Sequence, residues 1–163
     1  PTSRQNSQDN TGQGMPDIIM DCVEGSGLKI TAFPKGAGSE NMSLIGMLNP
    51  ADDPFDFIVR SVAKRAANAC PPLFLGIGIG GTFDLSARLV KHALLEMDGR
   101  EEKREELDLL HRINELGIGP MGLGGDTTAL GLQIERAYCH TASLPVAINF
   151  QCWANRKATE VIL

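Results

Sequence analysis

Apolar and polar positions along the chain follow two different periods, one typical of strands and one typical of helices. Short apolar runs bounded by glycine, proline or polar residues predict strands over 18–23, 28–33, 73–79, 128–138 and 144–150. Apolar residues spaced three or four positions apart predict helices from Asp53 to the Cys70-Pro-Pro72 stop, from about Thr82 to Gly99, over 101–116, and from about Ala154 to the C-terminus. The segment Glu24-Gly-Ser-Gly27 predicts a hairpin turn between the first two strands.

The helix that begins at Asp53 has the clearest pattern. Asp53 is a favourable N-cap residue, and Pro54 suits the first helical position. The apolar stripe that follows consists of Phe55, Ile58, Val59, Val62 and Ala66. Because strands and helices alternate in the middle of the chain, with a hairpin at each side, the sequence predicts an α/β fold. We expect a mixed β-sheet flanked by helices, in a single domain over residues 1–163.

Composition narrows the classes of function. A net charge of −5 and the lack of a basic stripe argue against a nucleic-acid partner, and no apolar run approaches the roughly 20 residues of a membrane span. The 4 cysteines are too sparse for a disulfide framework, which favours a reduced, cytoplasmic protein. The 18 glycines concentrate at 76–81 and 117–125, which indicates loops that crowd a site.

Two isolated cysteines carry the most specific chemical signal. Cys70 stands before Pro71-Pro72 and the apolar run from Leu73, and Cys152 ends another apolar run within Gln151-Cys-Trp153. The simplest interpretation is that both are small buried hydrophobic residues. Zinc fits poorly because no Cys-x-x-Cys spacing is present. Ligation of an iron–sulfur centre by distant cysteines remains open, and it requires a third ligand from elsewhere.

A glycine motif offers a second class of function. Gly76-x-Gly78-x-x-Gly81 follows a predicted strand and opens a helix, as in a dinucleotide-binding loop. The motif lies in mid-chain, however, and no acidic residue at the end of a following parallel strand is placed to bind a ribose. A nucleotide-binding module that uses Gly76–Gly81 is therefore an alternative to an enzyme with a metal centre.

Two further segments hold candidate residues. His140 lies in a turn between predicted strands, where it can orient a neighbouring carboxylic acid or simply cap the backbone. The small-residue loop Lys35-Gly-Ala-Gly-Ser-Glu-Asn41 offers backbone N–H groups to an anionic carboxylate, or forms a plain tight turn. Cys22, in a predicted strand, and Cys139 are interpreted as core or structural residues.

Five motifs in order extend this reading over nearly the whole chain. They are Lys35-Gly-Ala-Gly-Ser-Glu-Asn41, Cys70-Pro-Pro72 with Gly76-Ile-Gly-Ile-Gly-Gly81, Gly117-Ile-Gly-Pro-Met-Gly-Leu-Gly-Gly-Asp-Thr-Thr128, His140-Thr-Ala-Ser-Leu-Pro145 and Gln151-Cys-Trp-Ala154. Together they resemble the α subunit of class I fumarate hydratases, the iron–sulfur hydro-lyases that include L-tartrate dehydratase. The Gly-Ser-Glu-Asn and Gly-Gly-Asp-Thr-Thr forms look closer to the fumarases.

The resemblance implies a 4Fe–4S cluster whose second and third cysteine ligands match Cys70 and Cys152. It implies that the fourth iron binds substrate as a Lewis acid. Gly38 matches a loop glycine that contacts substrate, and His140 matches a histidine thought to pair with a catalytic aspartate. The implied reaction is the reversible hydration of fumarate to L-malate, with dehydration of L-tartrate or another 2-hydroxy diacid as the alternative.

The departures from the family pattern are also informative. The family's first cysteine and its aspartate belong to a Cys-Gln-Asp-Thr-Gly segment, whose expected place is before Pro1. Further substrate-binding residues belong to a β subunit or C-terminal domain, and Ala37 replaces the middle glycine of the Lys35 loop. We therefore expect the C-terminal portion of an α subunit, which assembles into an oligomer, acts on a small dicarboxylate, and is inactive by itself.

Overall fold

The computed structural model describes residues 8–9, 11–97 and 103–162. By its contacts the chain divides into two units, one over Thr31–Thr159 and the other over Pro1–Ile30 with Glu160–Leu163. The larger unit contains the central sheet and all of the helices described below.

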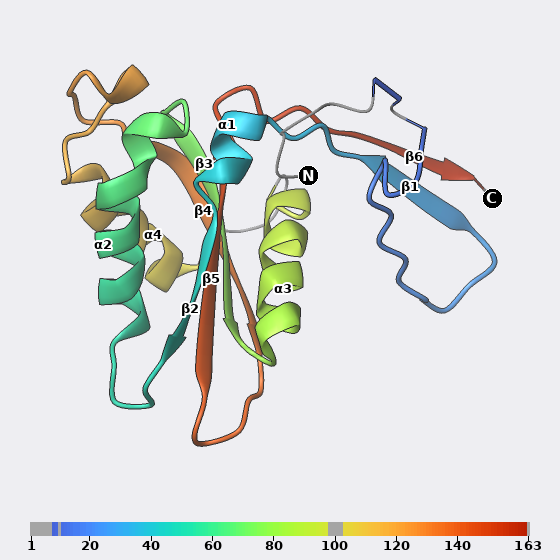
Figure 1. The fold of residues 1–163 in the computed structure, drawn as a ribbon, viewed down its shortest axis with the longest axis horizontal. Coiled ribbons are helices and arrows are strands. Elements are labelled where there is room, and N and C mark those ends of the chain that lie inside the picture. Colours follow the sequence, from blue (N-terminus) through green and yellow to red (C-terminus); the bar gives the residue numbers. More distant parts are fainter. Residues whose placement is uncertain (1–7, 10, 98–102, 163) are drawn as a thin grey trace. The chain divides into compact units, whose positions relative to one another are not determined.

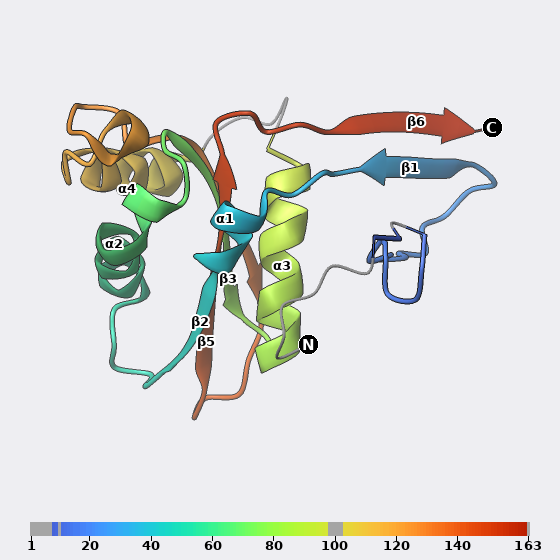
Figure 2. The same cartoon turned by 45° about the horizontal axis from the view of Figure 1, so that its top comes forward.

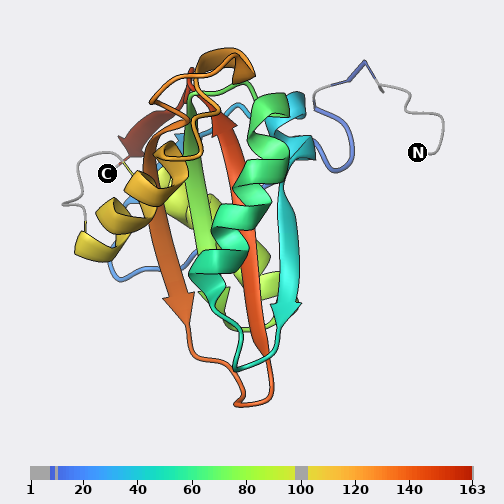
Figure 3. The ribbon, with the colours of Figure 1, turned by 90° about the vertical axis from the view of Figure 1, so that its left-hand side faces the viewer.

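The larger unit is built on a four-stranded sheet with the order β2-β5-β3-β4 (Figure 3). Its strands are β2 (Leu44–Leu48), β3 (Leu73–Gly80), β4 (Ala129–Ala137) and β5 (Leu144–Cys152). β5 pairs antiparallel with both β2 and β3, whereas β3 and β4 run parallel. The predicted mixed sheet is confirmed.

Helices cover both faces of this sheet (Figure 1). The helices α2 (Pro54–Arg65) and α4 (Arg104–Asn114) lie on one face, and α3 (Phe83–Leu95) lies on the other. The core under α2 and α4 contains alternate residues of the strands, such as Leu75 and Ile77, together with Ile58 and Val62 of α2. The stripe predicted for α2 is therefore confirmed, and Asp53 caps this helix by accepting from the Phe55 and Asp56 N–H groups.

The opposite face of β3 is made of glycines because α3 packs directly onto the strand. A Cβ added at Gly76 would lie 2.2 Å from the carbonyl oxygen of Val90, and one at Gly78 would lie 2.4 Å from that of Ser86. Ser86 also donates its hydroxyl to the Gly78 carbonyl at 3.0 Å. The helix therefore rests on its Ser86 and Val90 side. Phe83, at the start of the helix, is not part of this contact and is 60% exposed.

Both ends of the chain differ from the sequence prediction. Residues 18–23 form no strand, so the predicted hairpin is wrong, and the predicted C-terminal helix is also wrong. Instead β1 (Leu28–Ala32) pairs with β6 (Ala158–Ile162) (Figure 2), and the hydroxyls of Thr31 and Thr159 lie 3.0 Å apart. The β-branched residues of Ala158-Thr-Glu-Val-Ile162 favour a strand, but its partner lies far away in the sequence.

Two elements were not predicted at all. The short strand β2 contains Gly46 in its middle, which weakens the strand signal. The helix α1 (Ala37–Asn41) is formed by residues predicted as a loop. Of the helices in the described part of the chain, none is long and apolar enough to cross a membrane.

Candidate functional site

The sheet brings Cys70 and Cys152 to the same end. Leu73, three residues after Cys70, lies opposite Cys152 in the antiparallel pairing of β3 and β5. Because cross-strand partners and alternate residues of a strand share a face, Cys152 is on the side of Leu73 and Phe150. That is the face covered by α2 and α4, and Cys70 follows directly from α2 and the 3-10 turn η1 (Ala66–Asn68). The two residues predicted as ligands therefore lie at the same end of the sheet.

The backbone at Cys70 has an unusual conformation. Its φ is +60°, in the left-handed region that L residues with a side chain rarely adopt. A glycine would occupy this position without strain, whereas a cysteine there costs about 1–2 kcal/mol. Cys70 is exposed, and Cys152 is half-buried. Strain retained at an exposed reactive side chain is typical of a functional position.

The second glycine cluster lies beside Cys70. The Met121 N–H donates to the Pro71 carbonyl at 2.9 Å, which joins the turn η2 (Pro120–Gly122) to the residue after Cys70. Gly122 has a φ of +73°, and a Cβ there would lie 2.9 Å from that of Ala67 in η1. Residues 117–125 therefore form the predicted glycine loop and contact the segment around Cys70, whereas most of the other glycine cluster, 76–81, lies in β3.

The Lys35–Asn41 segment reaches the same end of the sheet. It does not form the predicted nest, since Gly36 has an extended backbone and caps the helix α1. Gly38 lies in this helix and is exposed, and a Cβ added there would stand 3.9 Å from the Asn68 carbonyl oxygen. Because Asn68 precedes Cys70 by two residues, the structure places Gly38 close to the cysteine end of the sheet.

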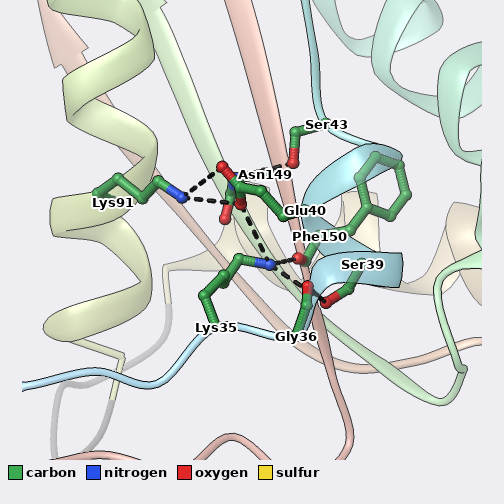
Figure 4. A network of polar contacts seen from close by, with 8 residues as sticks. All are labelled: Lys35, Gly36, Ser39, Glu40, Ser43, Lys91, Asn149 and Phe150. Carbon is green, nitrogen blue, oxygen red and sulfur yellow. Dashed lines mark hydrogen bonds and ion pairs between the residues drawn. The ribbon is translucent and has the colours of Figure 1, made fainter. Parts of the chain in front are cut away.

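A polar network holds this segment in place, and the sequence did not reveal it (Figure 4). Lys35 donates to the Phe150 carbonyl in β5 and to the Ser39 hydroxyl. The Glu40 carboxylate accepts from Lys91 of α3 at 2.8 Å and from Asn149 of β5 at 2.9 Å. In the sequence, only Lys35 and Glu40 of the motif point to such a network. Lys91 and Asn149 lie far away in the sequence and come close to Glu40 only in the folded chain.

Burial and charge shift both titrating groups of this network. Burial lowers the pKa of Lys35 to about 8, against the opposite effect of the Glu40 carboxylate. Burial also raises the pKa of Glu40, but the hydrogen bonds from Lys91 and Asn149 outweigh it and hold that pKa below its usual value.

His140 lies at the other end of the sheet. β4 starts beside Leu73 and ends beside Gly80, and His140 follows three residues after its last residue, Ala137. Eight residues of strand span about 25 Å, so within this chain His140 is far from Cys70. Its Nδ1 accepts from the Ala142 N–H at 3.1 Å, as a residue that caps a turn does. It also lines a surface hollow with Thr82, Phe83 and Tyr138.

The two cysteines at this end of the sheet are the right type of ligand for an iron–sulfur cluster, but they are too few to hold one. Thiolates are the ligands that such clusters prefer, and Cys70 and Cys152 supply two. Within residues 8–9, 11–97 and 103–162, no group of three or more His, Cys, Asp or Glu side chains is arranged to hold a metal ion. The residues present therefore fit a cluster only if a further ligand comes from another segment or chain.

The remaining sequence candidates have simpler explanations. Cys22 and Cys139 are both exposed, so their assignment to the core is wrong. Gly76 and Gly78 lie inside β3 and are required by α3, whereas the glycines of a dinucleotide loop follow the strand. Packing therefore accounts for the motif without a nucleotide.

Comparison with known proteins identifies the family and its relatives over nearly the whole chain. The family model described as "Fumarate hydratase (Fumerase)" matches residues 1–161. A protein of Methanocaldococcus jannaschii named "Putative L(+)-tartrate dehydratase subunit alpha" is 47% identical over 172 residues, covering 99% of this chain and 60% of the relative. The "L(+)-tartrate dehydratase subunit alpha" of Escherichia coli O157:H7 is 32% identical over 166 residues, covering 96% of this chain and 55% of the relative. The chain thus spans little more than half the length of these relatives.

Proposed function

Because this chain belongs to the fumarate hydratase family, we propose that it is part of the α subunit of a hydro-lyase that adds or removes water on a small dicarboxylate. The observation that carries the proposal is the position of Cys70 and Cys152 at the same end of the sheet, on segments far apart in the sequence. Two cysteine thiolates from distant parts of the chain are suitable ligands for an iron–sulfur cluster.

In this proposal Cys70 and Cys152 are two of the three cysteine ligands of a 4Fe–4S cluster, and the third comes from a segment outside this chain. When bound, the cluster supplies an iron with an open position, which acts as a Lewis acid on a carboxylate and a hydroxyl group. The exposed backbone of Gly38, next to η1, binds and orients the substrate beside it. The buried ammonium of Lys35 keeps this end of the sheet attractive to a dianion.

The role of His140 requires a second chain. With about 25 Å of strand between His140 and Cys70, a histidine that orients a catalytic aspartate acts in a site other than the one its own cysteines form. We therefore propose that His140 serves a site completed by another copy or subunit. This agrees with an oligomer, and with the relatives being named alpha subunits, which implies a β subunit partner.

The substrate we propose first is the fumarate and L-malate pair, on the Gly-Ser-Glu-Asn and Gly-Gly-Asp-Thr-Thr motifs. The names of the relatives favour L-tartrate as the second candidate. All four cysteines are free, in keeping with the reducing cytoplasm that an oxygen-sensitive cluster needs.

The test is anaerobic reconstitution of the full-length α subunit with its β subunit, iron and sulfide. We expect hydration of fumarate, dehydration of L-malate, or dehydration of L-tartrate, and the ratio of their kcat/KM values assigns the substrate. Titration with nicotinamide and adenine nucleotides is expected to give no binding. A complex that is loaded with iron and sulfide but turns over none of the three substrates would contradict the proposal.

A further inference from the structure

The short helix α1, which contains Gly38, has no hydrophobic anchor of its own. Among residues Ala37–Asn41, all of which the structure describes, Ser39 is the one buried residue. Isolated helices shorter than about 12 residues are marginal in water, and this helix has 5. Apolar packing therefore does not fix α1, and its place on the sheet depends on polar contacts.

These polar contacts meet at the carboxylate of Glu40 (Figure 4). Its two oxygens accept from the Lys91 ammonium of α3 at 2.9 and 2.8 Å, and Oε2 also accepts from Nδ2 of Asn149 in β5 at 2.9 Å. The Lys35 ammonium lies 3.5 Å from the same Oε2. One side chain of α1 thus contacts α3, the strand β5 and the segment that leads into α1.

Asn149 is a rigid attachment point for α1. It is 2% exposed and lies opposite Gly76 in the pairing of β5 with β3, inside the four-stranded sheet. Its Nδ2 also donates to the Ser43 hydroxyl at 2.7 Å, so the chain just after α1 is fastened to the same side chain. Because a buried, paired strand belongs to the most stable part of a fold, this attachment limits the movement of α1.

We propose that Glu40 is a positioning residue of the substrate site: its carboxylate fixes α1, and with it the backbone of Gly38, onto β5 and α3. The inference rests on the proposed function, in which Gly38 binds and orients the substrate. Gly38 is exposed, so its backbone is accessible to a ligand, and it lies two residues before Glu40.

The test uses the reconstituted complex of the full-length α subunit with its β subunit, and the substrate that this complex turns over best. A group that binds the ground state and the transition state alike affects KM rather than kcat. We expect Glu40→Ala to raise KM about tenfold with kcat changed less than about twofold, which is the size that loss of a charge-assisted hydrogen bond gives. Amide hydrogen exchange over residues 36–43 should become faster. Glu40→Gln, which can still accept hydrogen bonds from Lys91 and Asn149, should recover most of the difference.

An ion pair between two helices on the other face of the sheet is the matched control. Asp56 of α2 pairs with Arg112 of α4 at 2.5 Å, and its side chain is 50% exposed, against 45% for Glu40. Asp56→Ala should lower stability, as Glu40→Ala does, but should leave KM and the exchange over 36–43 unchanged. An equal rise in KM for both variants would overturn the inference, because a general loss of stability would then explain it.

Lys91→Met tests the same contact from the side of α3. It should also raise KM and speed the exchange over 36–43. The double variant with Glu40→Ala should change KM by less than the product of the two single changes, because both substitutions remove one shared contact. An active complex in which Glu40→Ala changes neither KM nor the exchange would overturn the inference.

The exchange measurement needs no turnover, so this failure is distinguishable from failure of the proposed function. An unsubstituted complex that turns over none of the three substrates would contradict the proposed function. The exchange over 36–43 in Glu40→Ala and Asp56→Ala would then decide by itself whether Glu40 fixes the segment of Gly38, and equal exchange in the two variants would overturn that role.

Discussion

Leu73 and Cys152 lie directly opposite each other in the antiparallel pairing of β3 and β5. This pair fixes the candidate site, because it sets the end of β5 beside the start of β3, where the chain has just left Cys70 and two prolines. The two thiols belong to segments 82 residues apart in the sequence, as the difference between positions 152 and 70 gives. The alternation of strand residues puts Cys152 on the face from which Cys70 arrives.

The first prediction concerns iron. In the reconstituted complex, Cys70→Ser and Cys152→Ser should each lose most of the bound iron and sulfide, since a hydroxyl is a poor substitute for a thiolate ligand. Iron and acid-labile sulfide per subunit are the quantities to measure. Cys139→Ser is the control, because Cys139 is an exposed cysteine at the opposite end of the sheet, and it should keep full loading. Unchanged loading in either of the first two variants would show that the ligand assignment is wrong.

Local patterns predicted the elements that form the core. The apolar residues around Ile58 and Leu109 have the spacing of a helix, and those around Ile77 and Ile148 form the short apolar runs of buried strands. Each pattern therefore indicates the element that places these residues in the core. The side of the strand that contacts α3 was predicted less well. There Gly76 and Gly78 were read as a loop signal, although they allow a helix backbone to approach a strand.

The features that the sequence did not predict depend on pairing between strands that are distant in the sequence. β6 pairs with β1, and no local pattern in the sequence shows that a strand near residue 30 pairs with one near residue 160. The convergence of Cys70 and Cys152 follows from strand register, which is likewise a property of the whole sheet. The separation of His140 from Cys70 has the same origin, because the parallel pairing of β3 and β4 carries that turn to the far end.

The second prediction tests the packing of α3. Gly76→Ala and Gly78→Ala should each lower the free energy of unfolding by about 3 kcal/mol, because the new methyl group meets a helix carbonyl at 2.2 or 2.4 Å. Gly131→Ala on β4 is the matched control. Its Cβ would have ordinary contacts of 3.6 Å, and it should change stability by about 0.5 kcal/mol or less. Denaturant unfolding measures all three, and a tolerated alanine at Gly76 would contradict the packing explanation.

The third prediction concerns the pH dependence of stability. The pKa of Glu40 is held below its usual value by Lys91 and Asn149 despite burial, so its ion pairs stabilise the fold fully above the unfolded pKa of 4.5. Glu40→Gln should therefore cost about 1 kcal/mol at pH 7. The difference should shrink as the pH falls from 4.5 through the lowered pKa of the folded state, where Glu40 itself becomes neutral. A difference for Glu40→Gln that stays constant over this pH range would contradict the assignment.

The fourth prediction separates stability from function at Cys70. Because Cys70 has a φ of +60°, Cys70→Gly should be more stable than Cys70→Ala by about 1 kcal/mol, although both variants lack the thiol and should lose the iron. The same two substitutions at Cys152 form the control. Cys152 ends a strand of ordinary backbone conformation, so there glycine should be the less stable of the two by about 0.5–1 kcal/mol. Chemical denaturation of the four metal-free variants measures both differences. Opposite signs at the two positions would show that the chain retains a strained cysteine where glycine fits better, and equal signs would remove backbone strain as a mark of the site.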